Sequence, residues 1–222
     1  CVSRRDFLRG SLNSGLEQWN LLGFNPFRVG VVAATDTHNG TPGRVAEETY
    51  VGHFGSREID APGRLQAAVP SGPRNSPGGL IAVWAEENSR GPLFDAMQRR
   101  EVYGTSGPRM AVRVFAGPDV PEDLCAGGDF VTRGDASGVP MGAELAATPG
   151  SAMKVAVLAE RDIGTEAAPG RGLERVQIVK GWLDDQGEPR VEVFDAAVTD
   201  APGSVDETTC EVAGQGSEAL CT

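Results

Sequence analysis

The chain has 222 residues, of which 40% are hydrophobic and 23% are charged, and its net charge is -11. This composition is typical of a soluble globular protein of one or two domains, and no apolar run approaches the roughly 18 residues of a membrane span. The negative charge, concentrated after residue 183, argues against nucleic acid or an anionic membrane as a partner.

The first predicted element is an amphipathic helix over residues 7–22. Its apolar residues recur at spacings of three and four, which places them on one face, and Gly23 follows as a stop signal: they are Phe7, Leu8, Leu12, Leu16, Trp19 and Leu22. The preceding Arg4-Arg5 pair fits a twin-arginine export pattern, but polar residues follow where such a signal has an uncharged apolar stretch. We therefore expect the apolar face of this helix to pack on the rest of the fold.

The second element is a small apolar run at residues 29–34, which predicts a strand buried on both faces. A polar cluster, Asp36-Thr37-His38-Asn39, follows it directly. Side chains two residues apart in an extended chain point the same way, so a carboxylate and an imidazole can face one site. We predict that Asp36 and His38 are ligands of a divalent zinc, manganese or iron ion. The alternative is a polar turn in which Asp36 caps the backbone, because this spacing alone is a weak pattern.

Three segments carry a family resemblance: NPFRVGVVAATDTHN at 25–39, GGLIAVWAEENSRGPLFDAMQRREVYGTSGPR at 78–109 and ERVQIVKGW at 174–182. Together they resemble a bacterial family of uncharacterised proteins, whose members look like the PHP (polymerase and histidinol phosphatase) class of metal-dependent phosphoesterases. The resemblance implies that Asp36 and His38 are the last two metal ligands of an α/β barrel. It also implies an upstream H-x-H motif, yet this chain has only His38 and His53. We expect a C-terminal portion of a longer protein, with weak metal affinity on its own.

Residues 40–79 form a long segment rich in proline and glycine, and such segments are often binding loops or lids. Since it follows the proposed ligands, we expect it to lie over the site. Its candidate polar contacts are Arg44, Glu47, Glu48 and His53.

A second predicted buried strand, at 80–84, ends in two acidic residues, Glu86 and Glu87. These carboxylates, together with Asn39, are candidates for contact with a substrate. Alternatively, Glu86 and Glu87 form the acidic first turn of the next helix, predicted at 91–100 with Leu93, Phe94 and Met97 buried.

From residue 109 the hydrophobic period changes to two. Segments 110–115, 153–158, 174–180 and 190–194 alternate polar with apolar residues, which predicts an antiparallel sheet, and residues 184–187 predict a hairpin turn between the last two. Cys210 and Cys221 are close enough in sequence to form a disulfide in an oxidising compartment.

The sequence thus predicts an α/β protein with two domains. Residues 1–108 would be the terminal strand-helix units of a PHP-like (TIM-like) barrel, and residues 109–222 an antiparallel β-sandwich-like domain. The expected function is metal-dependent hydrolysis of a small-molecule substrate, such as a phosphoester, with a metal-activated water as nucleophile. The full-length protein would be periplasmic or secreted, with the cytoplasm as alternative. The alternative functions are a non-catalytic exported binding or scaffold protein, or a carbohydrate-binding module that uses Trp182.

Overall fold

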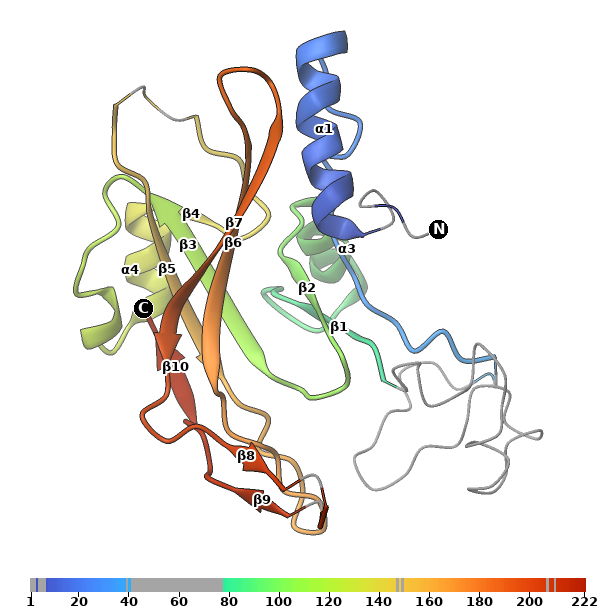
Figure 1. Ribbon diagram of the computed structural model, residues 1–222, viewed down its shortest axis with the longest axis vertical. Helices are drawn as coiled ribbons and strands as arrows, with labels where there is room; N and C mark the ends of the chain where they lie inside the picture. Colours follow the sequence, from blue (N-terminus) through green and yellow to red (C-terminus); the bar gives the residue numbers. More distant parts are fainter. Residues whose placement is uncertain are drawn as a thin grey trace.

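The computed structural model describes residues 3, 7–38, 40, 78–146, 148, 150–206, 208–209 and 211–222. This part of the chain is a mixed α/β structure with several small antiparallel sheets (Figure 1). Its elements in chain order are α1 (Leu8–Leu22), β1 (Leu80–Val83), α3 (Arg90–Gln98), β2 (Val102–Thr105), β3 (Ala111–Gly117), the 3-10 helix η3 (Leu124–Ala126), α4 (Phe130–Ser137), β4 (Val139–Pro140), β5 (Lys154–Glu160), β6 (Arg175–Leu183), β7 (Pro189–Val198), β8 (Ser204–Val205), β9 (Val212–Ala213) and β10 (Ala219–Cys221). None of the described helices is long and apolar enough to cross a membrane.

The predicted helix at the start of the chain is confirmed as α1, and Gly23 ends it in the left-handed conformation with φ 75°. The face that α1 buries differs from the prediction. Asn13 and Gly15 are its buried residues, whereas the predicted apolar face is largely exposed, with Trp19 50% exposed. The helix lies beside β6 and β7, where the side-chain amide of Asn13 donates to the carbonyl of Arg190 over 3.1 Å. The Asn13 side chain, which lies against Gly181 of β6 and bonds to β7, therefore anchors α1 in place of buried leucines.

The predicted barrel strand at 29–34 is wrong for the described structure. Residues 28–38 join no sheet, and Val29 and Val32 remain 56% and 58% exposed. The next two strands, β1 and β2, pair antiparallel, with Leu80 opposite Thr105, whereas a barrel needs parallel neighbours. No barrel is found among the described residues.

The helix predicted after β1 is confirmed as α3, although its predicted burial is not. Phe94 and Met97 are 56% and 45% exposed, and Ala96 is the residue it buries completely. Because α3 is short and packs against β1, the small side chain of Ala96 is the one that it buries fully.

All four strands predicted after residue 109 are confirmed, as β3, β5, β6 and β7. The largest described sheet has the order β10-β5-β3-β4, and its two faces carry different cores. Phe115 and Ala156 are paired across β3 and β5 and pack on Leu124 of η3 and Phe130 of α4. On the opposite face the neighbouring pair Val114 and Val157 packs towards β6 and β7. The alternating residues of β3 and β5 thus face two hydrophobic cores, one on each side of the sheet, rather than one core and solvent.

The predicted hairpin turn at 184–187 is also confirmed. Gly187 has φ 80°, and its N–H donates to the carbonyl of Asp184. The Asp184 carboxylate accepts hydrogen bonds from the backbone N–H of Glu188 (2.9 Å) and from Nε of Arg190 (2.8 Å), and these contacts hold its pKa below the ordinary value. The charge of Asp184 thereby fixes the turn that joins β6 to β7.

The β1–β2 pair is joined to β3 through a buried arginine, Arg113. Its Nη1 donates to Glu101 over 3.2 Å, and its guanidinium carbon lies 5.3 Å from the ring centroid of Trp84 and 5.1 Å from that of Phe115. Trp84 in turn donates from Nε1 to the carbonyl of Val112 over 2.9 Å. The Nε of Arg113 has no hydrogen-bond partner in the described structure, so the ion pair and the rings must compensate for its burial.

Replacement of Arg113 by alanine is expected to lower the free energy of unfolding by about 2 kcal/mol. It removes the hydrogen bond to the Glu101 carboxylate and the contacts with the two rings, and it leaves the exposed Arg99 as the remaining counter-charge of Glu101. Urea titration measures this change. The double variant R113A/E101A should lose less than the sum of the two single variants. Strict additivity would contradict a direct interaction between these side chains.

A disulfide joins Cys125 in η3 to Cys221 in β10, across a sequence separation of 96 residues. This corrects the pairing suggested from the sequence, in which Cys221 bonded to Cys210. Cys210 lies outside the described residues. Proximity in sequence was a poor guide here because the sheet brings β10 beside β5, under which η3 packs.

Loss of this disulfide is expected to destabilise the folded chain by roughly 4 kcal/mol, since a long closed loop restricts the unfolded state. The variants C125S and C221S, compared by urea titration with and without reductant, measure the effect. Reductant should shift the wild-type midpoint to that of C125S and leave both variants unchanged. A wild-type midpoint that is insensitive to complete reduction would contradict this role.

Candidate metal site

The segment that carries Asp36 and His38 is held by backbone packing against the β1–β2 pair. A Cβ atom added to Gly104 in β2 would lie 2.7 Å from the Cβ of Ala33, and one added to Gly79 would overlap the main chain of Ala34. Earlier in the segment, a Cβ atom added to Gly30 would lie 3.3 Å from the side chain of Arg100. The segment therefore runs alongside β2, and two glycines let it approach closely without forming a ladder.

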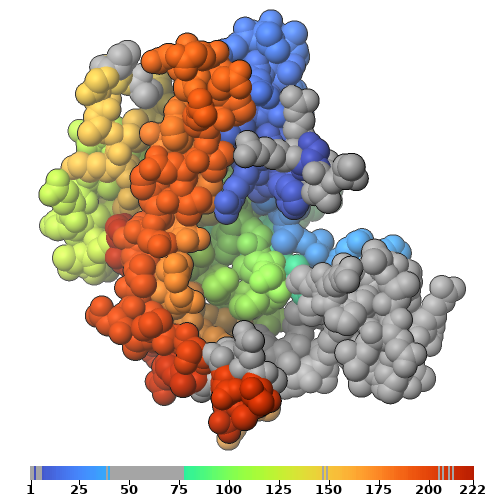
Figure 2. Space-filling model, viewed as in Figure 1, coloured from blue at the N-terminus to red at the C-terminus, as the bar shows by residue number. Residues whose placement is uncertain are grey.

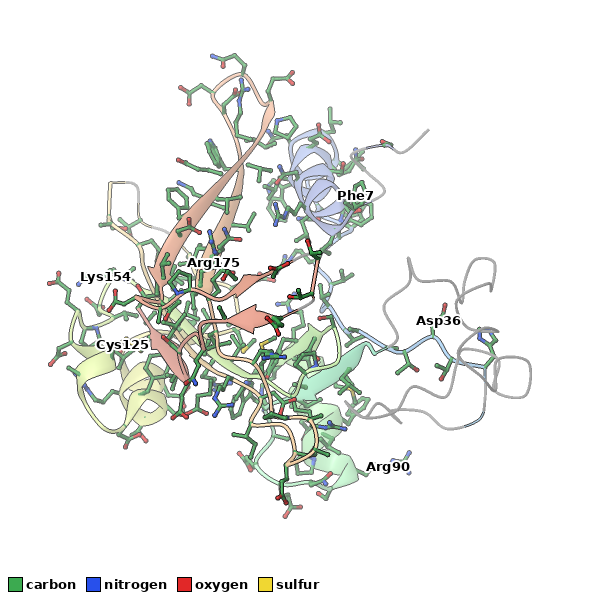
Figure 3. The ribbon with its side chains drawn as sticks, turned by 60° about the horizontal axis from the view of Figure 1, so that its bottom comes forward. Phe7, Asp36, Arg90, Cys125, Lys154 and Arg175 are labelled. Carbon is green, nitrogen blue, oxygen red and sulfur yellow. A yellow bond between two sulfur atoms is a disulfide. The ribbon has the colours of Figure 1, made fainter. Side chains whose placement is uncertain are left out.

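Asp36 breaks this extended run. It is one of two non-glycine residues with positive φ in the described structure, at 53°, a conformation that aspartate tolerates better than most residues. The turn brings the ring of His38 back, so that Nδ1 lies 3.0 Å from the main-chain oxygen of Asp36. Figure 3 shows Asp36 on a segment that extends away from the helices and sheets.

The contact between His38 and Asp36 makes Nδ1 of the imidazole a hydrogen-bond donor, because a carbonyl oxygen only accepts. In the neutral ring the lone pair then lies on Nε2. Histidine ligands of metals commonly have this arrangement, in which one ring nitrogen donates to a backbone carbonyl and the other binds the ion.

The alternative prediction was that the Asp36 carboxylate caps the local backbone. In the described structure this turn is capped by Thr35, whose hydroxyl lies 3.3 Å from the N–H of Thr37 and 3.0 Å from the Thr37 hydroxyl. The Asp36 carboxylate forms no hydrogen bond within the described part of the chain, and its residue is exposed. Its two oxygens are thus unoccupied by the local turn.

Glu86 and Glu87 lie elsewhere. The segment before Asp36 follows β2 from its first residue, Val102, past Gly104. The candidate ligands therefore lie beyond the end of the strand pair at which Leu80 is opposite Thr105. Glu86 and Glu87 follow Val83, at the opposite end of the strand pair. Both are exposed, and Glu87 accepts a hydrogen bond from the hydroxyl of Ser89, the residue before α3, so they precede the helix rather than form its first turn.

The remaining candidates are divided between the described and undescribed residues. Asn39, Arg44, Glu47, Glu48 and His53 all lie outside the described residues, as does most of the loop expected over the site. Among the residues that are described, no three histidine, cysteine or acidic side chains gather as a metal site would need. Asp36 and His38 are therefore part of a ligand set at most.

The proposed stacking platform, Trp182, is half-buried in β6. The ammonium of Lys180 lies 5.0 Å from the centroid of its ring. One face of the ring is therefore covered by a cation, which leaves little room for a sugar on that face.

Sequence reasoning missed the two glycines that position the candidate ligands. Gly79 stands in a run of glycines and Gly104 in a strand, where glycine often marks a close approach of another backbone. The pattern could have predicted such an approach, although not the segment that makes it.

The described structure is thus a mixed α/β protein in which one exposed turn carries a carboxylate and a histidine whose Nδ1 contacts the main chain. The chain belongs to DUF3604, a protein family of unknown function, whose family model matches residues 1–219. No curated protein and no solved structure matches it.

Substitution of Gly79 by alanine should lower the free energy of unfolding by about 1–3 kcal/mol, because the new Cβ overlaps the main chain of Ala34 and forces the segment away. The matched control is G91A, whose Cβ would meet nothing within 4 Å. Urea titration of both variants makes the comparison. Equal stability of G79A and the wild type would show that the segment does not pack on Gly79.

Proposed function

We propose that this chain supplies Asp36 and His38 to the metal centre of a PHP-like hydrolase that acts on a small phosphoester. The observation that carries the proposal is the hydrogen bond from Nδ1 of His38 to the main-chain oxygen of Asp36, which leaves Nε2 as the metal-binding nitrogen of the neutral ring. The resemblance of residues 25–39 to the last metal motif of the PHP class supplies the reaction type.

The two side chains fit a divalent zinc, manganese or iron ion, since one offers carboxylate oxygens and the other a neutral imidazole nitrogen. The other ligands would come from outside the described residues. When bound, such an ion supplies Lewis-acid activation of water and stabilises negative charge on the attacked group. The part of this chain is to hold the carboxylate and the imidazole two residues apart, on a turn packed against Gly79 and Gly104.

In this proposal residues 28–38 lie against a PHP-like barrel whose parallel strands are outside the described residues, since β1 and β2 pair antiparallel, and residues 109–222 support it as a β-sandwich-like domain. The exposed valines Val29, Val31 and Val32 favour the first part, because a barrel strand presents such side chains to its neighbours. Packing of β6 and β7 on the β3–β5 face favours the second.

The proposal also places the protein outside the cytoplasm. The disulfide between Cys125 and Cys221 supports this location, because structural disulfides persist in the periplasm and in secreted proteins and are rare in reducing compartments.

The test is elemental analysis of the purified full-length protein beside D36A and H38A, with hydrolysis of a phosphoester panel measured on the same samples. Wild type should carry stoichiometric zinc, manganese or iron, and both variants should lose metal and activity together. D119A is the matched control, because Asp119 is an exposed carboxylate outside this segment and its loss should change neither readout.

Wild-type protein without bound metal, after growth and purification in the presence of all three metals, would contradict the proposal. It would leave the non-catalytic binding or scaffold function as the better explanation. Metal retained by both variants would place the centre elsewhere.

A further inference from the structure

An open cavity of about 690 Å³ lies beside α1, away from the candidate metal ligands. Its walls come from α1, residues 25–31, the start of β2, residues 141–144, and the β6–β7 hairpin. Figure 2 shows α1, in blue, beside the orange hairpin that forms the opposite wall. The volume lies within the range of small-molecule sites, roughly 300–1,000 Å³.

The walls of this cavity are mainly apolar. Their apolar side chains come from separate elements and include Leu8, Leu12, Leu16, Phe27, Val179 and Val191. Leu8 and Leu12 of α1 are 49% and 40% exposed, so the cavity accounts for the part of the apolar face of α1 that these leucines form.

The charged residues of the lining have the opposite sign to the protein as a whole. They are three arginines, Arg9, Arg28 and Arg100, and one carboxylate, Glu144, in a chain whose net charge is -11. A cavity with apolar walls and a local positive charge concentrates organic anions.

Arg28 and Arg100 already hold a carboxylate. Oε1 of Glu144 accepts from Nε of Arg28 over 2.8 Å and from Nη2 of Arg100 over 3.0 Å, while Oε2 forms an ion pair with Nη2 of Arg28. Arg100 is held in the left-handed conformation, with φ 63°, and its Nη1 lies 3.4 Å from the carbonyl of Arg28. Both oxygens of one carboxylate are thus engaged by a fork of two guanidinium groups, as in bidentate recognition.

Glu144 is a replaceable occupant of this fork. It belongs to an exposed loop after β4, and its side chain is 49% exposed. An exposed ion pair contributes little net stability, so a second carboxylate that also buries an apolar body can take its place.

We propose that this cavity binds a monocarboxylate with an apolar body. The apolar part lies between α1 and the β6–β7 hairpin, and the carboxylate displaces Glu144 from Arg28 and Arg100. This inference does not depend on the metal centre, because none of the cavity residues is a candidate metal ligand.

Calorimetric titration of the full-length protein with octanoate, and with octanamide as its neutral counterpart, tests the proposal. Octanoate should bind about tenfold more tightly than octanamide, because a charge-assisted pair replaces a neutral hydrogen bond. R28Q and R100Q should each weaken octanoate binding about tenfold and leave octanamide binding unchanged. R90Q, which removes an exposed arginine outside the cavity, is the matched control and should bind octanoate as the wild type does.

The variant E144Q makes the decisive comparison, because a merely structural ion pair and a competing carboxylate predict different results. Loss of the Glu144 carboxylate, which competes for the two arginines, should tighten octanoate binding several-fold. This gain is measured without the arginine variants and so does not depend on how well they fold. Equal binding of octanoate and octanamide, no binding of either, or unchanged affinity in E144Q would each overturn the proposal.

Discussion

The described fold depends on the burial of one charge, that of Arg113. Its guanidinium group lies where β3 meets the β1–β2 pair, paired with Glu101 and covered by the rings of Trp84 and Phe115. An arginine in this position costs free energy unless it is paired and enclosed, so the residues around it must keep one arrangement. Tyr103 reinforces the junction, because its hydroxyl donates to the carbonyl of Met110 and accepts from the N–H of Val112, and burial raises the pKa of this tyrosine.

That junction also determines where the candidate ligands lie. Residues 28–38 pack on the β1–β2 pair through Gly79 and Gly104, and the pair itself is fixed to the main sheet through Arg113. On the other side of the same segment, α1 and the β6–β7 hairpin enclose the cavity beside Arg28. Residues 28–38 therefore contribute to two candidate sites. The turn at Asp36 suits a cation, whereas the cavity beside Arg28 suits an organic anion.

The sequence predicted the local elements well because their signals are local. The periodicity of α1, its stop at Gly23 and the turn at 184–187 all depend on residues near in sequence, and each is confirmed. Burial was predicted poorly for the same reason. The face that α1 presents to the fold depends on Arg190, far away in the chain, and the partner of Cys221 depends on how β10 joins the sheet.

The candidate site was predicted from residue type, spacing and a family resemblance. Asp36 and His38 were predicted as neighbours on a strand, whereas the structure places them on a turn with no ladder, and the tautomer of His38 depends on that turn. Glu86 and Glu87 looked equivalent to them in sequence because each pair follows an apolar run, but register with β2 puts the pairs at opposite ends. The spacing of residues in the sequence indicates which side chains could bind a ligand. The pairing of strands decides which of these side chains lie close together.

The most direct test is the nitrogen NMR spectrum of the His38 ring, first in this chain, where an H53Q variant leaves His38 as the one histidine, and then in the full-length protein, where the loss of a signal in H38A assigns it. The neutral ring should carry its proton on Nδ1, and the His38 signal of the full-length protein should change at Nε2 when zinc is added. The Nδ1–H signal should persist in the zinc-bound state. A proton on Nε2, or a His38 spectrum that zinc leaves unchanged, would contradict the central claim that this turn prepares His38 to bind a metal.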